Sequence, residues 1–481
     1  MIKETVFIIG GQRWKISDKK FQMVETPSSG EVKIPVFDKS VADKLLGVSK
    51  NTLEDTPSYE IVSFLNAVGQ RWKSKEYSRR RTYVKDLQKY LGYSEKMANA
   101  EADWIALMLC SHVGLQDTVA VELGNRHILD RWIIREDSEV RAYARGSVLH
   151  MLPGNVPLSS VVSILRSILT KNITIAKMSG EDIFTPMHLA LSFRDVDQDH
   201  PVTKSVSIVY WRGGLESPEI MSVVNNVDVV CAWGGQEAID WAVKHCRSHT
   251  EIIKFGPRRS LSILDKGACP NEAANAVAHD ISVYNQNACF STLQLFYVGD
   301  PTDFIEILKV SLDLYSNELL PPESVKSVDT QSGHALAVLE AEFKGDSVYV
   351  ADDHAWRIIV CDPKQVGKHP RGRTLYIHPV TSMDSVCEFV DSSVQSVSMM
   401  PLESSRLIRD KLAAAGVDRI VELGVNNVFR IGSSHDGVYP LQRMVRFVSN
   451  DLPSSHHPKG ITFSIEQTSI LEEERFLELV P

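Results

Sequence analysis

Cys289 is the residue in this chain best suited to covalent chemistry. It lies in the polar stretch 284–292, which reads Tyr-Asn-Gln-Asn-Ala-Cys-Phe-Ser-Thr. A thiol among amide and hydroxyl side chains can be ionised and offered to a carbonyl carbon. A helical pattern from Pro270 leads into this stretch and an apolar strand pattern, 293–298, leaves it, so we expect a nucleophile at an element junction. The alternative is that Cys289 is a small buried hydrophobic residue.

Three other short segments carry side chains or glycines that could serve such a thiol. Asn155 follows a predicted strand, where its amide could stabilise an oxyanion at the edge of a sheet. Lys177 and Ser179 end the next predicted strand, where a cofactor ribose or phosphate would lie. Gly234 and Gly235 join a strand to a helix, and paired glycines let backbone amides approach a pyrophosphate. The plainer alternatives are a turn residue for Asn155 and a solvated side chain for Lys177.

The elements that must position these residues alternate between strand and helix from about residue 146. The predicted strands are 147–150, 173–176, 207–210, 227–231, 252–255 and 260–264, and the predicted helices are 159–169, 186–192 and 236–246. This alternation is typical of βαβ units and a parallel sheet. It is a nucleotide-binding layout without a Gly-x-Gly-x-x-Gly loop, so a different turn would have to hold the phosphates. A second α/β segment begins near residue 268 and carries Cys289.

Composition excludes several classes of function. The 481 residues are enough for two or three domains, and a net charge of −9 gives no basic field to hold a nucleic acid. The seven cysteines are scattered, with no Cys-x-x-Cys pair, so neither a disulfide framework nor a metal site is indicated. The amino terminus indicates a strand and turn, and no apolar run is long enough to span a bilayer. We expect a cytoplasmic protein.

The order of the motifs is more specific than any one of them. It runs strand-Pro-x-Asn-x-Pro-helix, strand-Lys-x-Ser, strand-Gly-Gly-helix, and then Cys289, about 130 residues after Asn155. In this order the chain resembles the aldehyde dehydrogenase superfamily. Within it, the chain is most similar to the LuxC type of long-chain acyl reductase from the bacterial bioluminescence fatty acid reductase complex. That resemblance covers essentially the whole chain, and is carried by residues 5–14, 152–157, 285–289 and 432–440.

The resemblance implies an α/β, aldehyde dehydrogenase-like fold. Its parts are a doubly wound parallel-sheet cofactor domain, an α/β catalytic domain and a small β oligomerisation ribbon. With the patterns above, it divides the chain into a β-rich segment at 1–57, a helical segment at 58–128 packed on the cofactor domain, a ribbon at 129–145, a dinucleotide-binding domain at 146–267, a catalytic domain at 268–445 and a returning C-terminal segment at 446–481.

The resemblance also implies roles for the candidate residues. Cys289 matches the nucleophile that forms a thioester with a fatty acyl group, and Asn155, with the backbone amide at Cys289, matches the oxyanion hole. The cofactor-binding matches are Lys177 and Ser179 at the ribose and Gly234 and Gly235 at the phosphates. NADPH would deliver a hydride to the thioester carbonyl, and the resulting thiohemiacetal would release a fatty aldehyde. No metal is implied.

Three departures from the superfamily pattern bear on these roles. Gly180 stands where NAD-preferring relatives usually carry a Glu, whose carboxylate would repel a 2′-phosphate. The absence of that carboxylate favours NADPH, although Glu181 follows directly. The stretch 253–257, Ile-Lys-Phe-Gly-Pro, lacks the Glu that activates water in aldehyde-oxidising relatives, so the acyl-enzyme would persist. A second ribose-binding Glu has no clear counterpart near 376–379.

The partners implied by the resemblance are a long-chain acyl-CoA or acyl-protein donor, and the acyl-protein synthetase and acyl transferase subunits of a fatty acid reductase complex that supplies aldehyde for luminescence. A homodimer or tetramer is also implied, with ribbon strands near 132–134, 140–143 and 461–465. Two alternatives remain: a thiol acyltransferase or thioesterase that uses Cys289 without a redox cofactor, and an idle scaffold. The group that activates Cys289 stays open, with His150, His188, His354 and His435 as candidates by composition alone.

Overall fold

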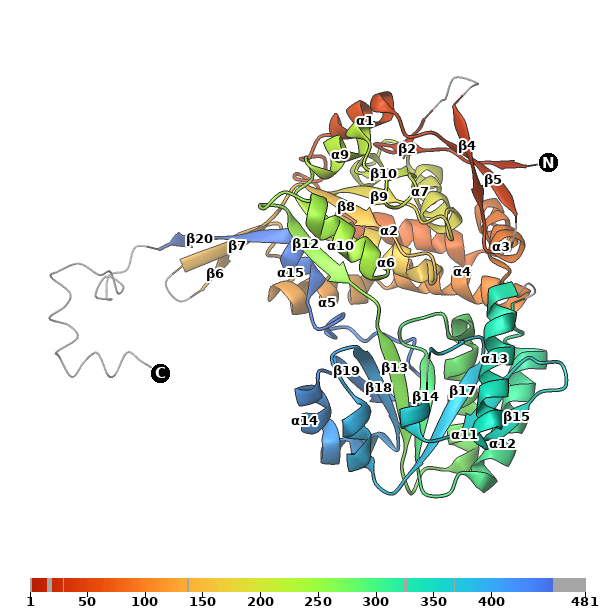
Figure 1. Ribbon diagram of the computed structural model, residues 1–481. Coiled ribbons are helices and arrows are strands. Elements are labelled where there is room, and N and C mark those ends of the chain that lie inside the picture. The colour runs from red at the N-terminus through yellow and green to blue at the C-terminus, as the bar shows by residue number, and fades with distance from the viewer. Residues whose placement is uncertain are drawn as a thin grey trace, which may run out of the picture.

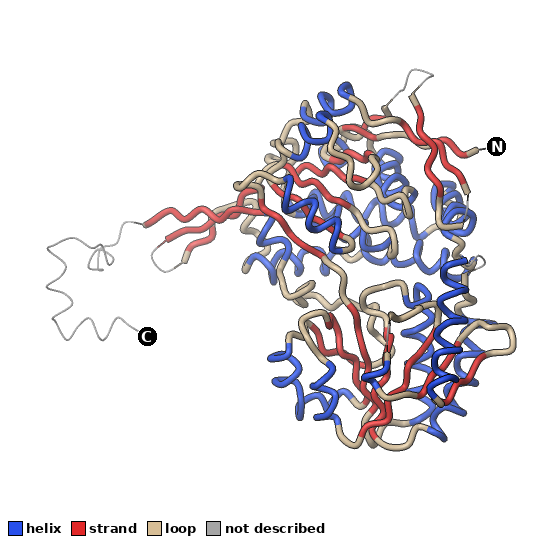
Figure 2. Tube along the Cα trace, in the orientation of Figure 1, coloured by secondary structure: helices blue, strands red, loops and turns tan. Residues whose placement is uncertain are grey.

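Two α/β halves stand one above the other, each built on a seven-stranded sheet (Figure 1). The computed structural model describes residues 2–14, 20–28, 30–135, 138–323, 328–366 and 368–452. The chain passes from the upper half to the lower between β12 (Glu251–Phe255) and β13 (Arg259–Leu264), as the tube in Figure 2 shows. Only three residues separate the end of one strand from the start of the next.

The upper half contains the predicted doubly wound sheet. Its strand order is β12-β11-β8-β9-β10-β2-β3, with β11 Val229–Trp233, β8 Ser147–Met151, β9 Ile173–Lys177, β10 Val206–Val209, β2 Ile8–Ile9 and β3 Gln12–Arg13. The strands β8 to β12 are parallel, and β2 joins β10 antiparallel. The chain moves outward from β8 to β10 and then returns to place β11 on the other side of β8. This reversal between β8 and β11 is the point where doubly wound sheets bind ligands.

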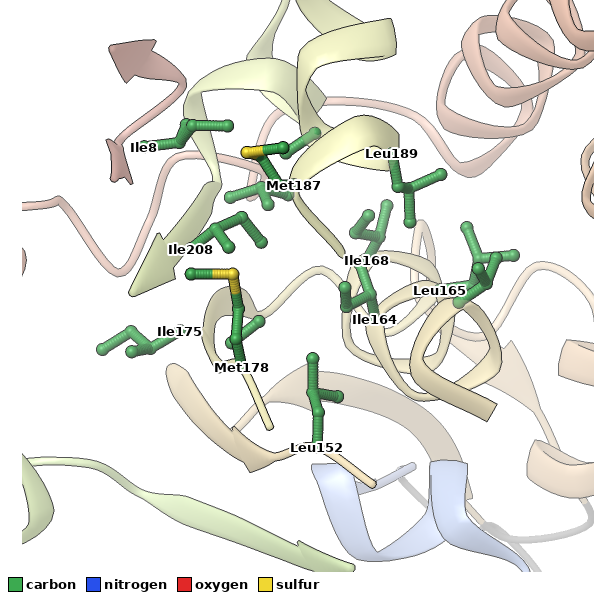
Figure 3. Packing of buried hydrophobic residues seen from close by; sticks show 14 of the residues in the cluster. Ile8, Leu152, Ile164, Leu165, Ile168, Ile175, Met178, Met187, Leu189 and Ile208 are labelled. Atoms are coloured by element: carbon green, nitrogen blue, oxygen red, sulfur yellow. The ribbon is translucent and has the colours of Figure 1, made fainter. Parts of the chain in front are cut away.

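Apolar helices cover this sheet and form its core. The expected helices are α6 (Pro157–Leu169), α7 (Phe184–Val196) and α10 (Gln236–His245), and two short helices that were not predicted, α8 (Pro201–Lys204) and α9 (Pro218–Val224), lie between them in sequence. Pro157 begins α6 at the first helical position, where a missing N–H costs nothing. Figure 3 shows Ile164 and Ile168 of this helix near Leu152, Met178 and Leu189. Ile164 and Ile168 are completely buried.

The segments before residue 129 pack against the upper half. In 1–57, β2 and β3 extend the first sheet, while a separate sheet has the order β1 (Lys3–Glu4), β5 (Glu31–Pro35), β4 (Phe21–Glu25). α1 (Lys39–Leu46) was not predicted. The helical segment contains α2 (Ser58–Lys73), α3 (Ser78–Leu91), α4 (Glu95–Cys110) and α5 (His112–Leu123). Among the described residues no single helix is long and apolar enough to cross a membrane; α4 and α5 pass that test only together, and they are bent by 67°.

The lower half is a second, mostly parallel sheet. Its order is β15-β16-β17-β14-β13-β18-β19, with β15 Ser347–Val350, β16 Arg357–Val360, β17 Thr374–Val380, β14 Thr292–Val298, β18 Val394–Met400 and β19 Arg419–Glu422. Its helices are α11 (Pro270–Ser282), α12 (Thr302–Leu314), α13 (Val328–Lys344) and α14 (Ser405–Ala415).

One predicted assignment needs correction, because β13 was expected in the dinucleotide-binding domain at 146–267. The structure places β13 at the centre of the second sheet, between β14 and β18. The first sheet therefore ends before residue 259. Two neighbouring apolar runs of strand length look alike in sequence, and their periodicity does not say which sheet each one joins.

A three-stranded ribbon projects from the upper half (Figure 1). Its order is β20 (Val445–Asp451), β7 (Ser138–Ala144), β6 (Ile133–Ile134), all antiparallel. Two of the expected ribbon strands, near 132–134 and 140–143, are thus found in β6 and β7. The third, 461–465, lies outside the described residues. The short helix α15 (Pro440–Met444) leads into β20 and packs near α5.

Candidate active site

The candidate residues lie where opposite edges of the two sheets meet. β8, β9 and β11 are parallel and in register, with Met151 beside both Lys177 and Ala232. The segments after these strands, which carry Asn155, Ser179 and Gly234, therefore leave the same carboxyl edge. Cys289 lies just before β14, at the amino edge of the second sheet. The short link from β12 to β13 brings these two edges together.

Asn155 reaches the segment that carries Cys289. Its side-chain Nδ2 donates to the backbone carbonyl of Asn287 at 2.8 Å, and Nη1 of Arg371 donates to the same carbonyl at 3.3 Å. The structure thus brings the predicted oxyanion donor within two residues of the predicted nucleophile. Arg371 is a cation beside this pair that was not predicted from the sequence.

A left-handed turn leads to Cys289. Tyr284, Asn285 and Gln286 have φ values of 53°, 47° and 62°, a region that residues other than glycine rarely adopt. Tyr284 is fixed by a hydrogen bond of 2.6 Å from its hydroxyl to the buried Glu101 of α4. The Gln286 amide donates to the carbonyls of Thr292 and Thr374, each at 2.8 Å, and accepts from the backbone N–H of Thr374 at 2.9 Å. These contacts offset the strain of the turn.

A second left-handed segment, at 371–373, is hydrogen-bonded to the turn at 284–286. Arg371, Gly372 and Arg373 have φ values of 57°, 60° and 64°. The Gly372 N–H donates to the carbonyl of Asn285 at 3.1 Å, and Nε of Arg373 donates to Oδ1 of Asn285 at 2.7 Å. Arg373 is buried and also donates to Ser316 and to the carbonyl of Leu320. The two turns therefore hold each other in place.

The second sheet is irregular on both sides of Ser260, at the level of Cys289. The pairing of β13 with β14 and with β18 shifts register here, which makes Leu293 and Gln395 the extra residues of two bulges. Bulges redirect side chains and are frequent beside active sites. Oγ of Ser260 donates to the carbonyl of Cys289 at 2.8 Å and accepts from the Ser396 N–H at 3.3 Å. Ser260 thus ties the nucleophile segment to the sheet.

Cys289 is half-buried as a residue, and the burial of its thiol favours the protonated form. Burial raises its pKa to about 11, and the charge of Asp436 acts in the same direction. Hydrogen bonds from the Gln395 side chain and from the backbone N–H groups of Cys289 and Phe290 act in the opposite direction. Cys289 is therefore poised between groups that favour and groups that oppose its ionisation.

A carboxylate lies near Cys289 although the 253–257 stretch supplies none. That stretch carries no carboxylate, but the structure brings Asp436 to Cys289 from the far end of the chain. Oδ1 of Asp436 accepts a short hydrogen bond from Nε2 of Gln395, and burial raises the pKa of Asp436. Neither residue was predicted from the sequence. An Asp-Gly turn at 436–437 and a lone amide in an apolar strand were the available signals.

Lys177 is a buried cation that has no counter-charge among the described residues. Its side chain is 9% exposed, and burial alone lowers its pKa to about 8. A buried ammonium group without an ionic partner is costly unless a ligand supplies an anion or hydrogen-bond acceptors. The position therefore fits the phosphate or ribose hydroxyls of a dinucleotide.

Ser179 lies against the loop that carries Asn155. A Cβ at Gly154 would come within 2.5 Å of Oγ of Ser179 and 2.7 Å of Oε2 of Glu181, so only glycine fits there. Oγ of Ser179 also accepts from the Glu181 N–H at 3.2 Å. The carboxylate of Glu181 thus lies close to the predicted ribose residue.

Gly234 and Gly235 form an open turn at the start of α10. Gly234 has φ of 143°, and a Cβ at Gly235 would meet no heavy atom within 4 Å. Gly235 is the N-cap of α10, whose free N–H groups and positive dipole end suit a phosphate. This turn lies beside β8, at the strand-order reversal where a dinucleotide would bind.

Three of the four candidate histidines have structural surroundings, and the fourth, His354, is exposed in a left-handed turn between β15 and β16. His150 is buried between Oγ of Ser163 at 2.7 Å and Oγ of Ser167 at 3.0 Å, and His188 contacts Asp86 at 2.8 Å. His435 stacks on Phe429 and meets the rings of Trp233 and Phe255 edge-on, and burial lowers its pKa well below the usual value. Within the described ranges no three His, Cys, Asp or Glu side chains are gathered for a metal ion.

Known proteins match the chain over most of its length. Residues 53–447 match the family described as Acyl-CoA reductase (LuxC). A long-chain acyl-protein thioester reductase from Vibrio harveyi is 43% identical over 483 residues, covering 100% of both chains. Another, from Aliivibrio fischeri, is 44% identical over 476 residues, covering 98% of each chain.

The fold is that of aldehyde dehydrogenases, as predicted. An NAD-dependent aldehyde dehydrogenase from Sinorhizobium meliloti superposes with a TM-score of 0.74 over 96% of this chain and 97% of its own, at 14% identity. At 14% identity this similarity shows a shared fold and nothing more.

Proposed function

The chain belongs to the acyl-CoA reductase (LuxC) family, and we propose that it reduces a long-chain fatty acyl thioester to a fatty aldehyde with NADPH, through an acyl-enzyme on Cys289. As an oxidoreductase of this family it needs a nucleophile, an oxyanion donor and a place for a reductant. The observation that carries the proposal is the hydrogen bond from Asn155 to Asn287, which joins the carboxyl edge of a nucleotide-type sheet to the segment that carries the thiol.

In the first step, the Cys289 sulfur attacks the carbonyl carbon of the acyl donor. A C–S bond forms to Cys289, the bond to the donor thiol breaks, and the Cys289 proton leaves with that thiol. Asn155 and the backbone N–H of Cys289 would stabilise the oxyanion of this step, and such a donor contributes roughly 3 kcal/mol. The Ser260 and Gln286 contacts fix the backbone from which the sulfur attacks.

The second step needs a hydride at the thioester carbonyl carbon, which a reduced nicotinamide would supply when bound. Lys177 and Ser179 would hold the ribose side of the cofactor, and Gly234 and Gly235 its phosphates. The buried ammonium group of Lys177, which has no ionic partner among the described residues, and the open turn at Gly235 support this assignment. The oxygen takes a proton, the C–S bond then breaks, and Cys289 recovers its thiol as the aldehyde leaves. We propose NADPH because Gly180 places no carboxylate directly after the Lys-x-Ser segment.

An apolar strip that begins at Phe290, next to Cys289, supports the proposal that the acyl chain is long. Phe290 meets Phe429 edge-on at 6.0 Å, and Val428 and Ile431 are about half exposed. Ile431 lies against α5 at Gly114, where a Cβ would be 3.3 Å from its Cδ1. Each methylene of a fatty chain buried on such a surface contributes about 0.8 kcal/mol.

The remaining proposals concern the setting of the reaction. We propose that the acyl donor is a long-chain acyl-CoA or an acyl-protein, and that the chain works in the cytoplasm with acyl-protein synthetase and acyl transferase subunits to supply aldehyde for luminescence. Homo-oligomerisation through the ribbon is supported by its exposed apolar residues, with Ile134 76% and Phe447 46% exposed.

The decisive experiment is incubation with labelled acyl-CoA in the absence of reductant, followed by peptide mapping. We expect the label on the peptide that contains Cys289, and aldehyde on later addition of NADPH. Cys289→Ala should abolish both but preserve energy transfer from tryptophan to bound NADPH. Unchanged aldehyde formation by Cys289→Ala would refute the proposal. Release of free acid, with no aldehyde and no cofactor signal, would instead favour the thioesterase alternative.

A further inference from the structure

We propose that Glu101 of α4 is a positioning residue for Cys289: through its hydrogen bond with Tyr284, this acid of the upper half anchors the turn at 284–286 and so places the sulfur opposite Asn155. The proposal deepens the proposed function, because it rests on Cys289 as the nucleophile and Asn155 as the oxyanion donor. Glu101 acts through Tyr284 and makes no contact with the acyl group.

The nucleophile segment is tied to both halves of the molecule. The lower half holds it through the 371–373 segment and through β17. From the upper half, Oε2 of Glu101 accepts a hydrogen bond from the hydroxyl of Tyr284 at 2.6 Å. The side chain of Asn155 donates to the carbonyl of Asn287 at 2.8 Å. The segment is therefore anchored to the upper half at positions 284 and 287.

Tyr284 needs an anchor because its backbone is strained. It has φ of 53°, a region that aromatic residues rarely adopt, and its side chain is buried. Such a conformation persists only where the surrounding structure over-determines it. The Tyr284 ring is adjacent to the rings of Trp104 of α4 and of Phe290, at centroid distances of 5.9 and 6.0 Å. Phe290 directly follows Cys289, so a movement of Tyr284 would displace the residue beside the sulfur.

Glu101 is a costly residue at this position if its role is packing alone. Its side chain is completely buried, and Oε1 makes no hydrogen bond among the described residues. A buried polar atom without a partner destabilises a fold, whereas leucine, of similar size, would leave none on α4. The hydrogen bond that Oε2 accepts from Tyr284 therefore explains why an acid stands here.

The arrangement predicts that reactivity and stability can be separated. Tyr284→Phe and Glu101→Leu each leave the other partner buried without its hydrogen bond, so each should lower Tm and slow acylation. The double variant Glu101→Leu/Tyr284→Phe removes both partners, so its Tm should return toward that of wild type. Its acylation should remain slow, because the turn still lacks its anchor.

Glu101→Gln is the conservative variant that tests for an acceptor without a charge. Burial raises the pKa of Glu101 to about 8, so near pH 7 the side chain is mostly neutral and Gln matches it in size and in its acceptor oxygen. Glu101→Gln should therefore recover most of the acylation rate that is lost in Glu101→Leu.

The test combines acylation rates with hydrogen–deuterium exchange on the full-length chain. Single-turnover labelling of Cys289 at rising acyl-CoA concentrations gives the maximal rate and the half-saturation concentration separately. In Tyr284→Phe and in the double variant we expect a maximal rate about tenfold lower, as suits the loss of one aligning hydrogen bond, and an unchanged half-saturation concentration. The backbone amides of 284–292 should exchange faster in both variants.

A double-mutant cycle with Asn155 adds a readout that a purely structural role would not change. Asn155→Ala should slow acylation less in the Tyr284→Phe background than in wild type, because the oxyanion donor is then already misplaced relative to the sulfur.

Tyr83→Phe is the matched control. Tyr83 of α3 is also completely buried, and its hydroxyl shares a hydrogen bond of 2.9 Å with Oγ1 of Thr185 in α7, away from the nucleophile segment. Tyr83→Phe should lower Tm as Tyr284→Phe does, but leave both acylation and the exchange of 284–292 as in wild type.

Wild-type acylation or wild-type exchange in the double variant would overturn the proposal, as would equal slowing in Tyr83→Phe. If the double variant does not fold, the comparison of Tyr284→Phe with Tyr83→Phe decides. Exchange needs neither acyl donor nor cofactor. If wild type forms no acyl-enzyme, the proposed function fails, and faster exchange in Tyr284→Phe alone still upholds the anchor. Normal acylation in every variant would leave the proposed function standing and refute the anchor.

Discussion

The side-chain amide of Asn155 donates to the backbone carbonyl of Asn287 at 2.8 Å, across 132 positions of sequence. One of its two N–H bonds is thereby fixed, and the other remains to face a developing charge. This contact joins the sheet that would hold the reductant to the segment that carries the thiol.

Asn155→Ala should slow acylation of Cys289 by about 100-fold, because an oxyanion donor contributes roughly 3 kcal/mol to the transition state. Cofactor binding should change little. The measurement is single-turnover transfer of label from acyl-CoA, with cofactor fluorescence in parallel. Asn99→Ala is a matched control, since that amide donates only to its own helix at Glu95. Equal acylation rates in the Asn155 variant and wild type would remove Asn155 from the oxyanion site.

Affinity for the reduced cofactor should fall as pH rises through about 8, because Lys177 loses its charge there. Lys177→Met should weaken binding about tenfold or more at pH 7 and show no such pH dependence, since a charged hydrogen bond contributes about 1.5–3 kcal/mol. Lys177→Arg keeps its charge and should give a flat profile. Titration by energy transfer from tryptophan measures each Kd. A wild-type profile that is flat from pH 7 to 9 would contradict the assignment of Lys177.

Gly180→Glu should move the coenzyme preference toward NADH, because a carboxylate there would repel a 2′-phosphate and accept a bond from a 2′-hydroxyl. Space is available, since the nearest atom to an added Cβ is the Tyr210 hydroxyl at 3.5 Å. We expect the ratio of kcat/KM for NADPH over NADH to drop about tenfold. Glu181→Gln should raise that ratio. If wild type uses both coenzymes equally, the preference for NADPH is wrong.

Glu101→Gln should flatten the dependence of thermal stability on pH. Burial raises the pKa of Glu101 from 4.5 to about 8, so its contribution to stability is full below pH 4.5 and is lost as pH rises toward 8. Gln has no proton to lose and still accepts from Tyr284. Wild type should therefore lose more Tm than the variant between pH 5 and 8. Glu95→Gln, an exposed change on the same helix, is the control and should lose as much Tm as wild type. If Glu101→Gln also loses as much Tm as wild type, the raised pKa of Glu101 is refuted.

Phe447→Asp should dissociate the proposed oligomer, because a charge at an apolar contact is costly to bury. Light scattering after size-exclusion chromatography gives the mass of each species. Leu407→Asp is the control, since Leu407 is 72% exposed on α14, remote in sequence from the ribbon. A wild-type chain that is monomeric at micromolar concentration would contradict the proposal directly.

Local sequence patterns predicted much of this architecture, because hydrophobic periodicity reports local burial. Strands β8 to β12 lie within two residues of their predicted limits, and Asn155 lies by the Cys289 segment as the motif order implied. Motif order succeeds here because consecutive parallel strands deliver their end residues to one edge of a sheet.

Contacts between distant segments could not be predicted in the same way. Gln395 and Asp436 lie on different elements, 41 residues apart, and no spacing links either to Cys289. The left-handed turn at 284–286 contains no glycine to mark it. The assignment of β13 to the second sheet likewise depends on partners far away in the chain.

The three-residue link at 256–258 joins two sheets but does not separate two cores. The segment around the thiol packs into the core of the first half, since Tyr284, Ala288 and Phe290 belong to the same buried cluster as Ile164 and Ile168 of α6. A substitution that reshapes the half proposed to hold the coenzyme is therefore expected to move the sulfur as well, so a lineage, or an engineer, that exchanged the electron donor would have to adjust both sites together.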